Sequence, residues 1–221
     1  MKAPKALYIE ELLELFKTRG MIVSDGDIDK IKHINYYKLK EFAHPLSKIK
    51  KVNNVVSISY DGVTFQEVLR RYYQDKNLRI YLLHAIEKIE VSIKTTLSHL
   101  MGLKYGAFGY LDFGLWVHRK KYRRFDVETR QYKFKKSILW NMKKRPSAEF
   151  NAKGNLDPDG FPTIWLTVDI LTFGEMVVMI EMMNSSLLSQ IADEYNATPE
   201  ELISWVNVCS LSGIYAPIIQ I

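Results

Sequence analysis

KNLRIYLLHAIEKIEVSIKTTLSHLM, residues 76–101, is the stretch of sequence that decides the fold. Its leucines and isoleucines recur at steps of three and four residues, which places them on one face of an α-helix. The members of this stripe are Leu78, Leu82, Ile86, Ile89, Ile93 and Leu97. The pattern predicts one long helix, which ends in a bend where Gly102, Gly106 and Gly109 follow one another.

Helical signals also dominate on both sides of this stretch. A capping-box pattern at Thr64–Glu67 starts the helix before it, and Thr198 followed by Pro199 starts the last helix. The other predicted helices cover residues 8–18, the region of Ile28 and Ile31, Asn35 to Phe42, 163–184, and 187–196 with Ser185 or Ser186 as its cap; residues 52–60 are predicted to be extended. Because no strand–helix alternation runs through the chain, we predict a mainly α, single helical domain over residues 1–221.

The composition is that of an ordinary globular protein. The chain has 221 residues, of which 47% are hydrophobic, and its net charge is +6. A single cysteine, Cys209, excludes a disulfide within the chain and with it a secreted, disulfide-rich scaffold. No apolar run approaches the roughly 18 residues of a membrane span. Acidic residues interrupt the N-terminus where a signal peptide would be apolar, so we expect a soluble, cytoplasmic protein.

The sequence has no motif for a metal, a cofactor or a nucleotide. Neither a glycine-rich phosphate loop nor a Gly-x-Ser-x-Gly elbow occurs, and no cysteines and histidines have zinc spacing. His84 and His99 are too far apart to share a metal. Glu87 and Glu90 stand one turn apart, but we expect them to be solvated or paired with Lys94, and not to act in acid–base catalysis. We therefore predict no cofactor and no metal site.

Residues 118–145 carry the basic character of the chain. They hold 12 Lys and Arg against two acids, a net charge of +10, which leaves −4 for the rest. Cations beside aromatic residues suit single-stranded RNA, whose bases stack while its phosphates are neutralised. The interleaved aromatic residues are Tyr122, Phe125, Tyr132, Phe134 and Trp140. The predicted RNA-binding residues are Arg119, Lys120, Lys121, Arg123, Arg124, Lys133, Lys143, Lys144 and Arg145.

A second interpretation explains the same segment without a ligand. In an ordinary amphipathic helix the aromatic side chains would face the core, and Lys and Arg would face solvent. Both interpretations fit the pattern, and the concentration of charge against an acidic remainder favours a polyanion partner. A membrane surface is the lesser option, because no continuous apolar face accompanies the basic one. The polar, Pro/Gly-rich loop that follows, residues 146–162, is long for a connection inside a domain, which indicates a functional or mobile segment.

The order of short motifs along nearly the whole chain is more informative than its composition. The motifs are Arg19-Gly20-Met21, Ile34-Asn35-Tyr36-Tyr37-Lys38-Leu39, Thr64-Phe65, Asp75 with Leu78-Arg79, Ile86-Glu87-Lys88-Ile89-Glu90, Tyr105-Gly106, Pro162 with Trp165, Phe173-Gly174 and Ser204-Trp205. In this order they resemble the Abi-like (abortive infection) proteins of bacteria. The resemblance implies a helical bundle related to the HEPN nucleases, a role in phage defence directed at RNA, a homodimer, and an antitoxin partner.

The resemblance also implies a metal-independent ribonuclease motif, Arg-Asn-x-x-Ala-His, just after Ser204-Trp205. Its His would move a proton at the ribose hydroxyl or the leaving oxygen, and its Arg would stabilise charge on the phosphate. This chain has Ser212 at the Arg position, Gly213 at the Asn position and Pro217 at the His position. Only Ala216 matches, so we expect no catalytic residues and no RNA cleavage by this mechanism.

One hypothesis explains the altered motif at the level of the gene. Permitted codons for residues 212–221, read from their third base, encode Arg-Asn-Ile-Cys-Ala-His-His-Ser-Asn. A single-base loss near Leu211 would then have shifted the frame and truncated an active enzyme. A divergent tail of a naturally short protein is the other explanation. The alternative functions are a non-catalytic RNA-binding protein and a helical interaction protein that dimerises or holds a partner.

Overall fold

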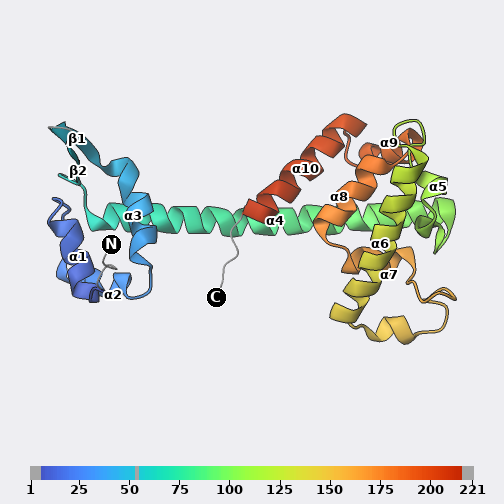
Figure 1. Cartoon of the computed structure of the whole chain (residues 1–221), viewed down its shortest axis with the longest axis horizontal. Coiled ribbons are helices and arrows are strands. Elements are labelled where there is room, and N and C mark those ends of the chain that lie inside the picture. The colour runs from blue at the N-terminus through green and yellow to red at the C-terminus, as the bar shows by residue number, and fades with distance from the viewer. Residues whose placement is uncertain (1–5, 53–54, 216–221) are drawn as a thin grey trace. The chain divides into compact units, whose positions relative to one another are not determined.

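The computed structural model describes residues 6–52 and 55–215 (Figure 1). Over these residues the chain forms ten α-helices and one two-stranded sheet, which confirms the predicted mainly α fold. The contacts group the chain into two compact units, residues 1–81 and 82–221. We call these the N-terminal unit and the C-terminal unit and describe each by itself. One domain over residues 1–221 stays a prediction.

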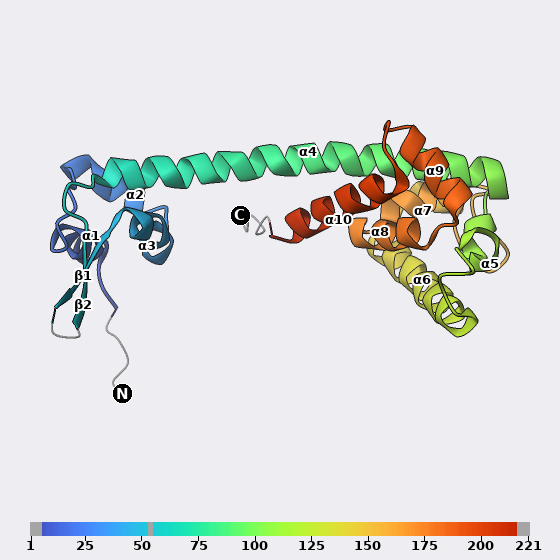
Figure 2. The same cartoon turned by 90° about the horizontal axis from the view of Figure 1, so that it is seen from above.

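The N-terminal unit consists of three helices, a β-hairpin and the first part of the longest helix. Its elements are α1 (Ile9–Lys17), η1 (Asp25–Asp27), α2 (Ile28–Ile31), α3 (Tyr36–Ala43), η2 (His44–Leu46), β1 (Lys48–Val52), β2 (Val55–Ser59) and the beginning of α4 (Phe65–Tyr105). The strands pair antiparallel, with Lys48 opposite Ser59. The hairpin extends away from the helices of the unit (Figure 2). The predicted extended segment is thus one half of a hairpin whose first strand the sequence did not reveal.

An aromatic cluster forms the core of the N-terminal unit. Phe16 of α1 is fully buried, and its ring centroid lies 5.0 Å from that of Tyr36 and 5.9 Å from that of Tyr60. Leu39 of α3 and Phe65 at the start of α4 are fully buried in the same cluster. Every helix of the unit therefore places an apolar face on one shared core.

Helix α4 joins two segments that the sequence predicts as separate helices. The predicted capping box is present, because Thr64 Oγ1 accepts a hydrogen bond from the Glu67 amide at 3.2 Å and Glu67 Oε2 accepts one from the Thr64 amide at 2.9 Å. Gly102 does not end the helix. It lies inside α4, where an added Cβ atom would be 3.3 Å from the Trp165 ring. The helix ends before Gly106, whose φ of +78° suits the residue after a helix terminus.

The apolar stripe of α4 is buried only towards its C-terminal end. Ile93 is 3% exposed and Leu97 is fully buried, whereas Leu78, Leu82 and Ile89 are exposed. The helical periodicity in the sequence therefore shows which face is apolar, but it does not show how far along the helix that face is covered.

The C-terminal unit contains the remaining part of α4 and six shorter α-helices packed with it. Its elements are η3 (Gly109–Leu111), α5 (Phe113–Trp116), α6 (Arg124–Lys144), η4 (Ala148–Asn151), α7 (Ile164–Ile170), α8 (Phe173–Met182), α9 (Ser185–Asp193) and α10 (Pro199–Tyr215). Trp116, Met176 and Ile180 are among its fully buried side chains. Its core belongs to the C-terminal unit alone and is separate from the aromatic cluster of the N-terminal unit.

Two further predictions about helix boundaries are wrong. The helix predicted over residues 163–184 breaks into α7 and α8, because Thr172 and Glu175 form a capping box that starts a new helix; Glu175 Oε2 accepts from the Thr172 amide at 2.8 Å. Helix α9 is capped by Asn184, one residue before the predicted serines. Its Oδ1 atom accepts from the Leu187 amide at 3.0 Å.

The polar loop after α6 is organised by its own hydrogen bonds. Asp157 Oδ1 accepts from the amides of Asp159 at 3.0 Å and Phe161 at 2.8 Å. At the end of the loop, the Pro162 carbonyl accepts from the buried Tyr110 hydroxyl at 2.6 Å. Burial raises the pKa of the Tyr110 phenol, so this hydroxyl remains a donor throughout the physiological range. The loop is thereby anchored to the core at its C-terminal end.

Candidate nucleic-acid interface

Helix α6 forms most of the basic segment, and its aromatic side chains do not all face the core. Phe125, Tyr132 and Trp140 are 76, 69 and 59% exposed, whereas Phe134 is buried and Tyr122 is half-buried. The interpretation of α6 as an ordinary amphipathic helix therefore fails for three of the five aromatic residues. These three side chains stand in solvent among the cations.

The exposed aromatic residues lie along one side of the helix. Phe125, Tyr132 and Leu139 follow one another at steps of seven residues. Seven residues make almost two turns, so these side chains form a line with spacings of about 10 Å. Phe134 and Ile138, which are buried, lie on the opposite side of the helix. We call the residues on the exposed side, Phe125, Tyr132, Lys136, Leu139, Trp140 and Lys143, the α6 strip.

All nine predicted RNA-binding residues are exposed. Three of them form hydrogen bonds or ion pairs: Arg124 Nε lies 2.8 Å from Glu128 Oε1, Arg119 Nε donates to the Gly114 carbonyl at 3.1 Å, and Arg145 Nη1 donates to the Asp169 carbonyl at 3.5 Å. The Glu128 carboxylate raises the pKa of Arg124, which keeps this guanidinium charged. The structure does not bring all nine into one pocket, because α6 alone is about 30 Å long. The cations instead extend along the helix.

The lysines near the C-terminal end of α6 lie close to the exposed Trp140. Lys144 Nζ lies 4.9 Å from the centre of the Trp140 ring. A shallow groove of about 440 Å³ is lined by Lys133, Lys136, Ser137, Leu139, Trp140 and Lys143. An aromatic ring and three ammonium groups thus face the same space, which is the combination that a nucleobase and its phosphates require.

A second groove, of about 640 Å³, runs between α6 and α8. Phe125 and Lys133 lie on its α6 side, and Val178 and Met182 lie on its α8 side. Arg130 also faces it, and its guanidinium carbon lies 5.7 Å from the centre of the Tyr122 ring. Arg130 and Lys136 were left out of the predicted binding residues. The seven-residue spacing of Phe125, Tyr132 and Leu139 could have indicated the exposed side and with it Lys136, whereas Arg130 lies on the side of the α6–α8 groove.

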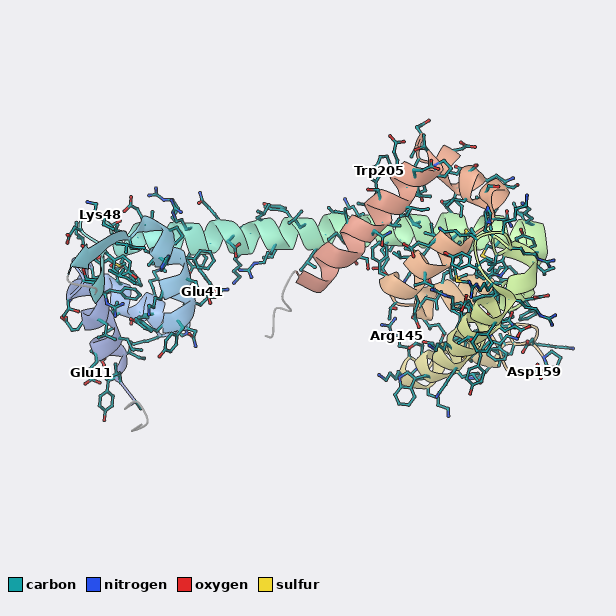
Figure 3. The ribbon with its side chains drawn as sticks, turned by 45° about the horizontal axis from the view of Figure 1, so that its top comes forward. Glu11, Glu41, Lys48, Arg145, Asp159 and Trp205 are labelled. Atoms are coloured by element: carbon teal, nitrogen blue, oxygen red, sulfur yellow. The ribbon has the colours of Figure 1, made fainter. Side chains whose placement is uncertain are left out.

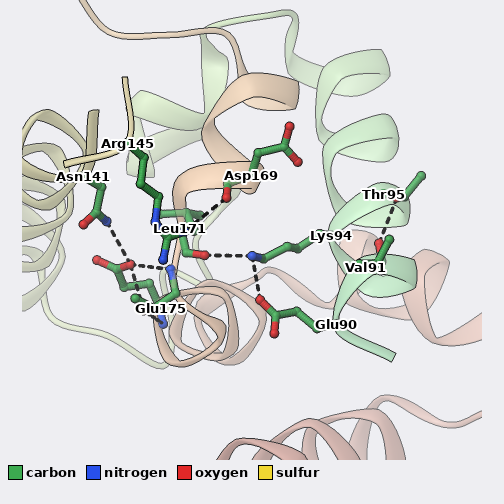
Figure 4. Close-up of polar contacts among 10 residues, drawn as sticks. Glu90, Val91, Lys94, Thr95, Asn141, Arg145, Asp169, Leu171 and Glu175 are labelled. Atoms are coloured by element: carbon green, nitrogen blue, oxygen red, sulfur yellow. Dashed lines mark hydrogen bonds and ion pairs between the residues drawn. The ribbon is translucent and has the colours of Figure 1, made fainter. Parts of the chain in front are cut away.

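A polar network joins the C-terminal end of α6 to α4 and to the α7–α8 junction (Figure 4). Lys94 Nζ lies 2.7 Å from Glu90 Oε1 and donates to the Leu171 carbonyl at 2.8 Å. This confirms the expected pairing of Glu90 with Lys94. Arg145 Nη1 donates to the Asp169 carbonyl at 3.5 Å. Asn141 Nδ2 donates to Glu175 Oε2 at 3.4 Å, so the C-terminal part of α6 is hydrogen-bonded to the first turn of α8.

Comparison with known families identifies the chain at this point. The family model for Abi-like proteins matches residues 29–211. The chain belongs to the Abi-like family. No curated protein and no solved structure matches it. The Abi-like match covers the whole of α6, and membership supports a function of the abortive-infection type.

The positions expected for the Abi-like catalytic pair are only partly described. Ser212 and Gly213 lie in the α10 backbone, and side chains of this helix are described as far as Ser210. Pro217 lies outside the described residues. The identities alone carry the chemical argument, because a serine side chain has no positive charge and a proline has no titratable group.

One pair elsewhere in the Abi-like chain has the same five-residue step from Arg to His, Arg79 and His84 on α4. Arg79 forms an ion pair with Asp75, and His84 Nδ1 lies 3.9 Å from Glu87 Oε2. Both side chains therefore contact acidic neighbours on their own helix.

Two further findings concern the described part of the chain. No group of three or more His, Cys, Asp or Glu side chains there could hold a metal ion. Among the helices of the same residues, none is both long and apolar enough to cross a membrane.

Proposed function

We propose that this Abi-like protein acts in abortive infection by binding single-stranded RNA along the α6 strip. The observation that supports the proposal is the exposure of Phe125, Tyr132 and Trp140 on a helix rich in cations. Aromatic side chains exposed together on one helix are typical of a binding surface. Unpaired bases offer flat apolar faces that stack on aromatic rings without regard to sequence.

The cations of the strip supply the second requirement of RNA binding. Lys136 and Lys143 lie on the same side of α6 as the aromatic line, and Lys133 borders it. Ammonium groups at these positions can neutralise phosphates between stacked bases and release counterions. A duplex would leave the aromatic rings without partners, because its bases are already stacked on each other.

We further infer that the chain binds RNA without cutting it by the Arg–His mechanism of its proposed HEPN relatives. Ser212 cannot stabilise phosphate charge as Arg does, and Pro217 cannot transfer a proton as His does. A labelled RNA incubated with the full chain should stay intact. Cleavage that persists after metal chelation and is absent from a matched mock purification would contradict this inference.

The gene-level hypothesis has its own test. Sequencing the coding DNA across codons 205–221 should show a shifted frame that reads Arg-Asn-x-x-Ala-His and continues as an open reading frame. Expression of the frame-repaired gene should then yield a metal-independent ribonuclease. A DNA sequence without such a frame would exclude the base loss and leave natural divergence of the tail.

The binding proposal is tested by fluorescence anisotropy with a labelled 20-nucleotide single-stranded RNA. The full chain should bind it with an affinity that falls steeply between 50 and 200 mM salt, as phosphate contacts require. Replacement of Lys133, Lys136 and Lys143 by Ala should lower the slope of log affinity against log salt by about 2, at about 0.7 per lost contact.

A matched control removes the same kind of charge elsewhere in the C-terminal unit. Lys88 and Lys153 are exposed and lie outside α6. Their replacement by Ala should leave the slope unchanged. If the control lowers the slope as much as the α6 variant does, RNA responds only to total charge and the α6 strip is not the site.

We propose a homodimer as a second property, which an apolar groove of the C-terminal unit favours. The groove measures about 590 Å³ and lies between α4 and α10. Ile89, Trp205 and Val208 line it and are all substantially exposed, and Cys209 lies beside them. Two copies could cover these side chains by an isologous contact. An antitoxin partner and a cytoplasmic location stay predictions.

Analytical ultracentrifugation tests the dimer at micromolar protein concentration. The full chain should sediment as a dimer with little dependence on salt, because the groove is apolar. Val208→Asp should shift the equilibrium to monomer, and Leu103→Asp, at an exposed apolar position outside the groove, should not. A monomer at all concentrations, or equal effects of both variants, would contradict this assignment.

A further inference from the structure

The N-terminal unit contains a helix–turn–helix followed by a hairpin. Helices α2 and α3 are joined by residues 32–35, a connection of the length that this motif uses. Ile34 in the turn is buried in the core of the unit. Asn35 caps α3, since its Oδ1 atom accepts from the Tyr37 amide at 2.8 Å. The turn is therefore fixed from both sides, by an apolar contact and by a cap.

A short extended segment between α1 and η1 pairs with the residues that connect the hairpin to α4. Ile22, between α1 and η1, pairs with Thr64 in an isolated parallel bridge. The Ile22 amide donates to the Val63 carbonyl at 2.9 Å, and the Phe65 amide donates to the Ile22 carbonyl at 2.9 Å. The order is thus helix, short extended segment, helix, turn, helix and hairpin. By fold-level analogy this is the order of a winged helix–turn–helix.

The charge of this region is concentrated in the motif and its hairpin. Residues 28–59 hold seven lysines and two acids, Asp29 and Glu41, a net charge of +5. Both acids lie in local ion pairs, Asp29 of α2 with Lys32 just after that helix at 2.7 Å and Glu41 with Lys38 of α3 at 2.8 Å. Residues 48–59 contain three lysines and no acid. A basic surface of this kind is the electrostatic requirement for binding a polyanion.

Helix α3 has one face in the core and one face in solvent. Tyr36, Leu39 and Ala43 are buried, whereas Tyr37 and Glu41 are exposed on the other side. Lys48, exposed at the start of β1, follows α3 after the η2 turn. Figure 3 marks Glu41 on α3 and Lys48 at the hairpin. The exposed face of the second helix of the motif and the base of the hairpin are both accessible.

We propose that the N-terminal unit is a second nucleic-acid-binding site, which binds duplex DNA with α3 in the major groove and β1 against the phosphates. The major groove of B-form DNA is about 12 Å wide and admits an α-helix, whereas that of A-form RNA does not. The exposed side of α3 presents Tyr37 as its aromatic residue, in contrast to the line of aromatic residues on α6. This assignment does not depend on RNA binding by α6.

The test measures anisotropy of a labelled 20-base-pair DNA duplex with the full chain. The hairpin variant replaces Lys40, Lys48, Lys50 and Lys51 by Ala. Its affinity at 150 mM salt should be at least tenfold lower than that of the unchanged chain. The slope of log affinity against log salt should fall by about 3 to 4, at about 0.9 per lost contact. Single-stranded RNA binding should change less than about twofold.

The α6 variant, with Lys133, Lys136 and Lys143 replaced by Ala, provides the converse control. It should lose RNA affinity and keep DNA affinity within twofold. DNA binding that is lost in the α6 variant and kept in the hairpin variant would overturn the proposal. Equal binding of a DNA duplex and an RNA stem-loop, with the same loss of affinity in the hairpin variant, would also overturn the proposal. Attraction to the charged backbone alone would explain that result.

A variant that leaves the hairpin intact keeps the proposal testable if the lysine variant fails to fold. Glu41→Gln removes an acid from the exposed face of α3. If that face meets phosphate or base edges, DNA affinity should rise two- to fourfold at 150 mM salt. Glu11→Gln, on α1 outside the proposed contact, should have less effect. A fall in affinity with Glu41→Gln, or an equal rise with Glu11→Gln, would overturn the proposal.

Discussion

The two basic regions of the molecule differ in what stands between their charges. Helix α6 carries three exposed aromatic side chains among its cations, whereas residues 28–59 keep Tyr36 in the core and expose Tyr37. Charge of one sign therefore fits the polyanion proposed for each region but does not distinguish a single strand from a duplex. The three exposed aromatic side chains on α6 favour a single strand there, because unpaired bases can stack on them.

The largest effect should come from opening a cavity in either region. Leu39 and Ile138 are both fully buried, one in each core. Replacement of either by Ala should lower the free energy of unfolding by about 2–5 kcal/mol in urea denaturation. Leu39→Ala should weaken DNA binding and spare RNA binding, and Ile138→Ala should do the reverse. Loss of both activities in both variants would show that the two regions do not act separately.

The next effect should come from the aromatic side chains of the α6 strip. Stacking contributes about 1–3 kcal/mol per base, so replacing Phe125, Tyr132 and Trp140 together by Ala should weaken RNA binding at least 100-fold. DNA binding should stay within about twofold, because these residues lie outside the proposed duplex site. Tyr81→Ala, at an exposed position on α4, serves as the control. An RNA affinity that depends on the lysines and not on these three rings would refute stacking.

The smallest effect should come from two equivalent helix caps, one in the N-terminal unit and one in the C-terminal unit. Hydrogen bonds from the amide and hydroxyl of Thr64 lower the pKa of Glu67, and those of Thr198 lower the pKa of Glu201, from an ordinary value of 4.5. A carboxyl whose pKa is lower in the folded state stabilises the protein above its ordinary pKa. That stabilisation is lost as the pH falls through the folded-state pKa.

The caps are tested by urea denaturation between pH 6 and pH 3. Glu67→Gln and Glu201→Gln should each reduce the loss of stability in the lower part of this range, because glutamine keeps a capping oxygen and does not titrate. The reduction should be small, since both side chains are exposed. Variants whose stability depends on pH as steeply as that of the unchanged chain would show that neither cap contributes.

The helices could be predicted because their signals are local. Periodicity and caps such as Thr64 with Glu67 determine where a helix runs and where it starts. The break at Thr172 carried the same signal as Thr64 and could have been predicted from it. The burial of α4 could not, because whether Leu82 or Leu97 is covered depends on residues far away in the sequence.

The second basic region did not show in the charge count, because positive and negative charges in different parts of the chain cancel. A remainder of −4 outside residues 118–145 combines +5 over residues 1–81 with −9 over residues 146–221. Counting the charges of each structural unit separately reveals the positive charge of the N-terminal unit, but the unit boundaries come from the structure.

The exposed side of α6 is a related case. The seven-residue spacing of Phe125, Tyr132 and Leu139 could be found in the sequence. Which side of α6 meets the core could not, because it depends on α5 and α7.

The reactivity of Cys209 can report whether the groove beside it is occupied. The sequence has no other cysteine, and partial burial raises the pKa of this thiol, so its alkylation should be slow at neutral pH. Because Cys209 lies beside Trp205 in the groove between α4 and α10, any molecule seated there should slow the reaction further and alter the tryptophan emission. Mass spectrometry of timed alkylation would then read occupancy in the unmodified chain, without a tag or a label.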